Sequence, residues 1–202
     1  MKLLFILALA FAAAPHGRAQ TTAPKGKTAM TEQPAPKPAD PRDVGSPEQI
    51  VAALYDVISG PAGKKRDWDR MRSLFIPGAR LMPTGPRRPP GTPADAPLKG
   101  DEEWAASVLD VEGFIERSNK YLEERGFFER EIARRTERFG HIVHVFSTYD
   151  SRHKADDPQP FARGINSIQL MNDGRRWWVI SIFWEAETPR TPLPGTYLKS
   201  AR

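Results

Sequence analysis

The sequence predicts an α+β domain in which three N-terminal helices pack on a curved, mostly antiparallel sheet. Apolar residues recur at helical spacing in three segments between residues 46 and 126. Residues 161–184 contain two runs of β-branched and aromatic residues around the turn signal Asn172-Asp173-Gly174, which predicts a hairpin of two long strands. The second of these strands, residues 177–184, is apolar at nearly every position, so we expect both of its faces to be covered.

The N-terminal residues have the pattern of an export signal. Lys2 precedes an apolar run at residues 3–14, and Gly17 and Ala19 fit the small-residue rule for signal-peptide cleavage. The run is shorter than the roughly 20 residues that a membrane-spanning helix needs. We therefore expect residues 1–19 to be a signal peptide, the mature protein to be periplasmic or extracellular, and no membrane span to remain after cleavage.

A low-complexity segment follows the signal. Residues 20–47 are rich in Pro, Thr, Ala and Lys, and their only larger apolar residues are Met30 and Val44. Such a segment buries too little surface to fold, so it predicts a disordered linker. Residues 48–188 then have the size of one domain, and residues 189–202 are expected to form a C-terminal tail.

Composition excludes several classes of protein. The sequence contains no cysteine, which rules out disulfides and a thiolate nucleophile. The formal charge of +5 falls to +3 once Lys2 and Arg18 leave with the signal peptide. Because charges of both signs are interspersed, we expect no nucleic-acid partner.

Start and stop signals delimit three helices. Ser46 precedes Pro47 in a capping box, and the helix that begins there is stopped at Gly60. Asp67 caps a second, short helix, which ends before Pro77-Gly78. A third helix begins at Asp110 and is stopped by Gly126.

The strands are less sharply marked. We expect a short strand at residues 79–82, and then a Pro/Gly-rich loop at residues 83–100. The heavily charged segment 127–139 is compatible with helix or strand, and Gly126 and Phe139-Gly140 at its ends favour a partly exposed strand. Residues 141–149 form a further strand and residues 150–160 a polar loop.

Three segments together resemble a known family: residues 68–79 (WDRMRSLFIPGA), 139–149 (FGHIVHVFSTY) and 173–184 (DGRRWWVISIFW). They resemble the nuclear transport factor 2-like superfamily, which includes SnoaL-like polyketide cyclases and ketosteroid isomerase. The resemblance covers residues 48–187. It implies a cystatin-like cone of helices against a curved sheet, a pocket for a small-molecule ligand, and a homodimer formed through the outer sheet face. We expect Val179 to face outward on that sheet.

Several catalytic and binding motifs are missing from the sequence. It contains no Gly-x-Ser-x-Gly elbow and no Gly-rich phosphate loop followed by Lys and Ser or Thr. His141 and His144 are three residues apart on one strand, which sends them to opposite faces, and His153 lies in a loop without ligands at metal-binding spacing. We expect no metal and no cofactor.

Acid/base chemistry in a dry pocket is the remaining catalytic possibility. It requires an inward carboxylate or histidine and an opposing hydrogen-bond donor. His144 or Asp150 are candidates for the base, and Tyr55 or Tyr149 for the donor. Since none matches a catalytic motif, we assign no catalytic residue.

Strand alternation predicts which residues line the pocket, although both faces of these strands are apolar. The favoured set consists of residues from one face of each strand and two from the helices: Tyr55, Trp68, Val145, Ser147, Tyr149, Ser167, Gln169, Ile182 and Trp184. The opposite register would present His144, Thr148, Asn166 and Ser181 instead.

These observations predict an exported domain that binds a small apolar or amphipathic ligand or serves as a structural dimer. One alternative is a cofactor-free isomerase, cyclase or dehydratase that acts by proton transfer. Another is a protein-interaction module of the cell envelope. An inward ionisable residue in a closed apolar pocket would favour the enzyme.

Overall fold

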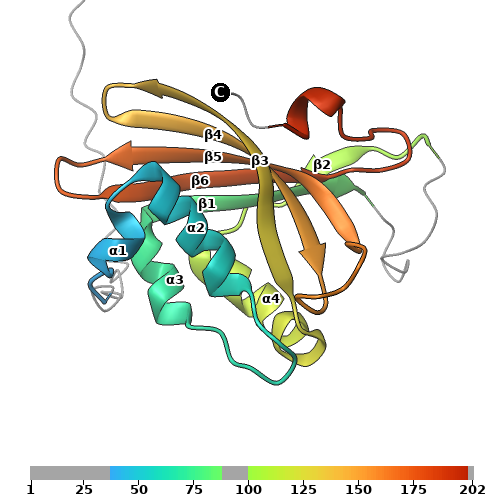
Figure 1. The fold of residues 1–202 in the computed structure, drawn as a ribbon, viewed down its shortest axis with the longest axis horizontal. Coiled ribbons are helices and arrows are strands. Elements are labelled where there is room, and N and C mark those ends of the chain that lie inside the picture. The colour runs from blue at the N-terminus through green and yellow to red at the C-terminus, as the bar shows by residue number, and fades with distance from the viewer. Residues whose placement is uncertain (1–36, 88–99, 200–202) are drawn as a thin grey trace, which may run out of the picture. The chain divides into compact units, whose positions relative to one another are not determined.

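The computed structural model describes residues 37–87 and 100–199, which form an α+β domain with a bent sheet (Figure 1). The predicted signal peptide, most of the predicted linker and most of the loop at residues 83–100 lie outside the described residues. The sheet has six strands in the order β2-β1-β6-β5-β4-β3, and the β1–β6 pair is parallel. Its strands are β1 (Phe75–Pro86), β2 (Trp104–Ala106), β3 (Phe128–Phe139), β4 (Ile142–Arg152), β5 (Ala162–Asn172) and β6 (Trp177–Ala186).

The predicted helix starts are confirmed by their capping contacts. Ser46 Oγ accepts a hydrogen bond from Gln49 N (3.2 Å) at the start of α2 (Pro47–Ile58). Asp67 caps α3 (Trp68–Leu74) in the same way, and Asp110 caps α4 (Val111–Arg125). Each cap satisfies a backbone N–H that has no partner inside the helix.

The helices differ from the prediction in number. A short additional helix, α1 (Pro41–Val44), lies in the segment predicted as linker, where Asp43 is buried and pairs with Arg70 of α3 (2.7 Å). The ordered domain therefore begins before residue 48. The third predicted helix, α4, follows β1 and β2, so the helices are not all N-terminal.

The sheet is larger than the sequence indicates. The expected strand in residues 127–139 is present as β3, and the hairpin of β5 and β6 turns at Gly174, whose φ of 92° suits glycine. β1 is longer than residues 79–82, β2 was not predicted, and β4 continues into the expected polar loop as far as Arg152. These extensions are polar or irregular, and pairing with a neighbouring strand fixes them as strand.

The hydrophobic core lies between the helices and the inner face of the sheet. A register shift between Gln169 and Leu170 places Ile180 as an extra residue on β6. Val179 is completely buried in this core, paired with Leu170 and Phe75. The expectation that Val179 faces outward is therefore wrong. The side chains of Val179, before the bulge, and of Ile182, after it, both point to the inner face of the sheet.

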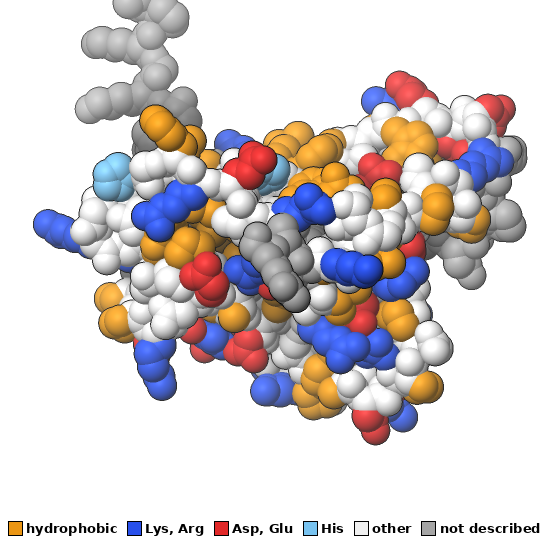
Figure 2. All heavy atoms as spheres, turned by 45° about the horizontal axis from the view of Figure 1, so that its top comes forward, with side chains coloured by type: hydrophobic (Ala, Val, Ile, Leu, Met, Phe, Trp, Pro, Cys, Tyr) orange, Lys and Arg blue, Asp and Glu red, His pale blue; other side chains and the backbone are white. Residues whose placement is uncertain are grey.

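The outer sheet face is covered in part by the chain's own C-terminal segment. The 3-10 helix η1 (Gly195–Tyr197) lies over β3 and β4, where Thr148 Oγ1 donates to Tyr197 O (2.6 Å) and the Phe146 and Tyr197 rings are 5.2 Å apart. The outward side chain of Phe183 on β6 remains 45% exposed. One chain thus covers only the inner face of β6, and Figure 2 shows hydrophobic groups separated by charged side chains on the part of the surface that it turns forward.

Among the described residues, no helix has the length and apolar character that a membrane crossing requires.

Candidate functional site

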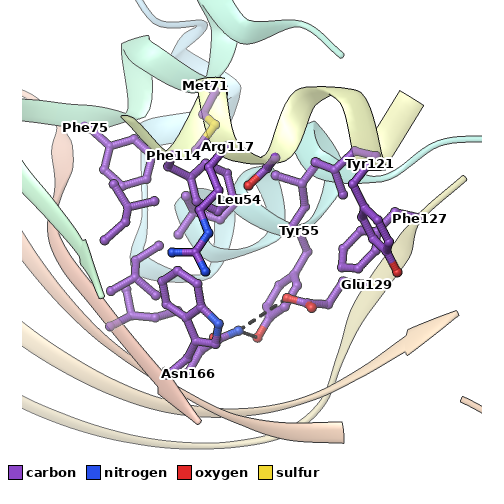
Figure 3. Close-up of a pocket in the computed structure, with 17 residues that line it drawn as sticks. Leu54, Tyr55, Met71, Phe75, Phe114, Arg117, Tyr121, Phe127, Glu129 and Asn166 are labelled. Atoms are coloured by element: carbon purple, nitrogen blue, oxygen red, sulfur yellow. Dashed lines mark hydrogen bonds between the residues drawn. The ribbon is translucent and has the colours of Figure 1, made fainter. Parts of the chain in front are cut away.

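A cavity of about 290 Å³ lies between α2, α4 and the inner face of the sheet (Figure 3). Most of its wall is apolar, and its polar groups are few. It is lined by Leu54, Tyr55, Ile58, Met71, Phe75, Leu81, Phe114, Arg117, Ser118, Tyr121, Leu122, Phe127, Glu129, Asn166, Ile168, Ile182 and Trp184.

The apolar wall comes from helix and strand positions that face each other across the cavity. Ile182 and Trp184 pack against the core but stay half-buried, since they border the open space. The rings of Phe114 and Trp184 meet edge to face at 6.2 Å. Tyr121 lines the cavity and is 40% exposed, so the cavity reaches the surface beside α4.

The polar groups of the sheet side form one connected cluster. Asn166 Nδ2 donates to Tyr55 Oη (3.1 Å) and, at the limit of hydrogen-bond distance, to Glu129 Oε1 (3.5 Å). Ser151 Oγ donates to Glu129 Oε2 (2.8 Å). Figure 3 shows Tyr55, Glu129 and Asn166 pointing towards one another at the cavity wall.

The end of α2 holds two members of this cluster in place. Ser59 follows the last residue of α2, and its hydroxyl donates to Tyr55 O (2.6 Å) and accepts from Glu129 N (3.0 Å). The helix that carries Tyr55 is thereby tied to the strand that carries Glu129. The chain reaches β3 directly from α4 through Gly126, which has a φ of 72°.

The hydrogen bonds fix the direction of the Tyr55 hydroxyl. Ser147 Oγ donates its only proton to Glu131 Oε1 (2.6 Å), so in its contact with Tyr55 Oη (2.7 Å) it accepts. Tyr55 therefore donates to Ser147 and accepts from Asn166. This arrangement leaves Tyr55 no proton for a ligand.

Glu129 is the ionisable group best placed to act on a molecule in the cavity. Burial raises the pKa of its carboxyl to about 7, against the lowering effect of hydrogen bonds from Ser151 and Asn166. The residue keeps some accessible surface, and it lines the cavity. No salt bridge to Glu129 is found in the part of the chain that the structure describes. The group can therefore change its charge near neutral pH.

The residues predicted to line the pocket lie in four different environments in the structure. Tyr55, Ile182 and Trp184 are on the cavity wall. Val145, Ser147 and Tyr149 face inward but are buried in packing outside the wall. The helix residue Trp68 packs against the core, and its indole donates to Asn119 (2.9 Å).

The structure contradicts the placement of Ser167 and Gln169. Both lie on the outer face, where Ser167 hydrogen-bonds His144 Nε2 (3.0 Å) and Gln169 is exposed. The cause is the register of β5: Ser147 pairs with Asn166, which turns Asn166 inward together with Ile168. The sequence had assigned Asn166 to the opposite register, and strand alternation alone could not decide between the two.

Tyr149 owes its position to a glycine. A Cβ on Gly164 would lie 2.5 Å from Tyr149 Oη and 2.3 Å from Glu185 O, so only glycine leaves room for the ring. Burial and the nearby Glu129 raise the pKa of the Tyr149 hydroxyl above its ordinary value. Tyr149 therefore fills the interior beside the cluster and does not border the cavity.

The two bases proposed from the sequence lie elsewhere. His144 is on the outer face, beside Phe146. Asp150 is buried, which favours its neutral form, but hydrogen bonds from Arg152 and Arg130 hold its pKa below the ordinary value. Neither lines the cavity. Glu129 was missed because it stands in a run of charged residues, where nothing in the sequence separates an inward carboxylate from exposed ones.

No metal centre is apparent in residues 37–87 and 100–199, where no three His, Asp or Glu side chains are grouped as metal ligands.

Comparison with known proteins gives a fold likeness only. No protein-family model and no curated protein matches the chain. An NTF2-like protein of unknown function from Silicibacter pomeroyi has 12% identity and a TM-score of 0.42, over 69% of this chain and 92% of that one. NTF2-like proteins of unknown function from Methylobacillus flagellatus (11% identity, TM-score 0.41, 71% and 95% covered) and Shewanella baltica (16%, 0.41, 71% and 98%) are similar to the same extent. All three are described as NTF2-like, the superfamily that the sequence resembles. At these TM-scores the similarity supports no inference about function.

Proposed function

We propose that this domain binds a small, mostly apolar molecule that carries a polar group. The observation that carries the proposal is the cavity of about 290 Å³ with an apolar wall and one polar cluster, formed by Glu129, Asn166 and Tyr55. Apolar cavities of about 150 Å³ are large enough to bind benzene, so a cavity of this size accepts a substituted ring or a comparable chain.

Two contributions to the binding free energy favour such a ligand. Burying its apolar body against Phe114, Ile182 and Trp184 yields about 25 cal/mol for each Å² removed from water. A polar atom of the ligand must find a partner in the cavity, because an unpaired buried polar group costs roughly 1–3 kcal/mol. Glu129 meets this need in either state, since its neutral carboxyl donates to a carbonyl and its carboxylate accepts from a hydroxyl.

Binding can be tested with 1-naphthol, which has an apolar body and one hydroxyl. We expect saturable binding by titration calorimetry. Ile182→Phe, which enlarges a side chain of the wall, should weaken the affinity about tenfold, since the larger ring competes with the ligand for space and overpacking costs about 1–3 kcal/mol. Ile132→Phe is the matched control, since Ile132 is 37% exposed and outside the cavity. Absence of binding, or equal effects of both variants, would contradict the proposal.

A second candidate function is cofactor-free proton transfer, which one observation favours: the pKa of Glu129 is raised to about 7. A general base works best when its pKa lies near the working pH. The carboxylate would remove a proton from a carbon next to a carbonyl and return it to the product. Because the Tyr55 hydroxyl already donates its proton to Ser147, Tyr55 is not the hydrogen-bond donor to the resulting enolate.

Proton transfer can be measured without knowing the substrate. We expect the unmodified domain to accelerate exchange of the α-protons of 2-tetralone for deuterium in D₂O, and Glu129→Gln to abolish the acceleration. Equal rates for the two proteins would leave binding as the function.

Export is part of the proposed function and rests on the pattern of residues 1–19. The mature protein, recovered from the periplasm or the medium, should begin near Gln20. N-terminal sequencing measures this, and an intact Met1 on the recovered protein would contradict it.

A further inference from the structure

We propose that Arg117 makes the cavity selective for small amphipathic anions, whose carboxylate pairs with its guanidinium while the apolar part occupies the cavity. This inference rests on the proposed binding function and names the class of ligand.

Arg117 is placed to meet a ligand. It projects from α4, lines the cavity and is seen in Figure 3 reaching into it. None of the hydrogen bonds, ion pairs and ring contacts found among the described residues involves Arg117, which is exposed to solvent where it borders the apolar wall. An arginine beside an apolar cavity without a protein acceptor is available to an acceptor on the ligand.

Neighbouring arginines of the same layer differ from Arg117 in this respect. Arg70 pairs with Asp43 and Asp56, and Arg72 pairs with Asp69 and Glu112. Buried Arg66 donates to the backbone carbonyl groups of Ile58, Gly60 and Leu122. These guanidinium groups are paired with protein acceptors and do not line the cavity, so among the described residues Arg117 is the cation that faces it.

The geometry favours a carboxylate over a larger anion. A single guanidinium matches the two oxygens of one carboxylate through parallel N–H donors. A phosphate dianion would need more positive charge than this wall supplies, since Arg117 is the only Lys or Arg among the described residues that line the cavity. The Glu129 carboxyl enters from β3, so an anionic head is better placed beside α4 than beside Glu129.

The test uses two probes that share an apolar body and differ in the head group: 3-phenylpropanoate and 3-phenylpropan-1-ol. Both are titrated into the unmodified domain, Arg117→Gln and Lys120→Gln by calorimetry at about pH 6. Lys120 is the matched control, because it lies on α4, is 83% exposed and is outside the cavity. Thermal unfolding of each variant checks that the fold is unchanged.

We expect the unmodified domain to bind the propanoate roughly three- to fivefold more tightly than the alcohol, since an ion pair with a solvent-exposed arginine contributes up to about 1 kcal/mol. Arg117→Gln should remove that preference and leave the alcohol affinity unchanged, while Lys120→Gln should alter neither. Added salt should weaken the propanoate alone. Tight alcohol binding without a preference for the propanoate, or an equal loss of both probes in Arg117→Gln, would overturn the role of Arg117 and leave the binding function standing. Failure of both probes to bind the unmodified domain would overturn the two proposals together.

Discussion

At the scale of single residues, the chemical character of the cavity depends on Glu129. Its carboxyl is surrounded by protein, yet its hydrogen-bond donors are the neutral groups of Ser151 and Asn166. Neutral donors stabilise a carboxylate less than a cation does, so burial dominates and the proton is held more tightly than in water. The charge of the site is thus set by pH rather than by a fixed ion pair.

The first prediction concerns the pH dependence of stability. The pKa of Glu129 rises from its ordinary value of 4.5 to about 7 on folding, so the folded state binds the proton more tightly. The contribution of this group to the free energy of unfolding is therefore full below about pH 4.5 and is lost as the pH rises to about 7. Glu129→Gln cannot ionise, and its stability relative to the unmodified domain should increase by about 2 kcal/mol between pH 5 and pH 8.

Urea unfolding of both proteins at the two pH values measures this difference. Glu185→Gln, at an exposed position of β6, serves as the control for the loss of a carboxyl group. A pH-independent effect of Glu129→Gln would mean that the carboxyl has its ordinary pKa in the fold.

Whether a residue could be placed at the cavity from the sequence depended on whether its local sequence pattern fixes the direction of its side chain. Tyr55 lies on a helix whose apolar stripe is clear, and the structure finds it at the cavity. Asn166 was assigned to the wrong face because the residue opposite it depends on how β4 and β5 align, which local sequence does not encode. Glu129 could be recognised as a cavity residue only from the folded structure, in which it contacts Ser59 and Ser151.

At the scale of secondary-structure elements, one arginine joins the ends of two helices. The Arg66 guanidinium is buried and donates to Ile58 O at the end of α2 (2.8 Å), to Gly60 O (2.7 Å) and to Leu122 O near the end of α4 (2.9 Å). It also donates to Lys64 O. Helix C-termini carry partial negative charge, which a cation stabilises. Arg66 therefore fixes the two helices that border the cavity.

The second prediction tests whether Arg66 stabilises the fold by linking the ends of α2 and α4. Arg66→Met should lower the free energy of unfolding by roughly 2–3 kcal/mol, because it leaves buried carbonyl groups without donors. Arg66→Lys should restore little of it, since an ammonium group cannot serve several carbonyls in different directions. Chemical denaturation measures both, with the exposed neighbour Lys65→Met as control. Equal stabilities of Arg66→Met and Lys65→Met would refute the role of Arg66.

Elements were predictable where their ends are marked locally and not where tertiary pairing defines them. The caps Ser46, Asp67 and Asp110 place three helices. The strand β2 has three residues and exists through its pairing with β1. The bulge at Ile180 follows no visible sequence signal, and it breaks the strict alternation from which outward-facing residues of β6 were predicted.

At the scale of the whole domain, the outer sheet face is covered unevenly. The segment around Tyr197 packs on β3 and β4, whereas Ile142 and Phe183 stay 59% and 45% exposed. The two residues lie apart on this face, Ile142 on β4 and Phe183 on β6. We propose that a second copy of the chain covers this face, as the apolar pattern of residues 177–184 predicts.

The third prediction is therefore a homodimer in solution. Phe183→Glu should convert it to a monomer that still folds, since a charge at an apolar interface is costly while Phe183 adds little to the core. Lys120→Glu on α4 is the control and should remain dimeric. Sedimentation velocity measures both. A substitution at Val179 would not serve, because that residue is completely buried. A monomeric unmodified domain would contradict the prediction.

The parallel pairing of β1 with β6 has a consequence for how the chain reaches its fold. Arg80 pairs with Ser181 and Thr84 with Glu185, so strands about one hundred residues apart in sequence must meet before the sheet is continuous. Closing so long a loop is slow, and a chain still emerging from the ribosome lacks the strand that its early strand requires. Folding is thereby delayed until synthesis is nearly complete. This delay would suit the proposed export, because export machinery that handles extended polypeptides could engage the chain during that time.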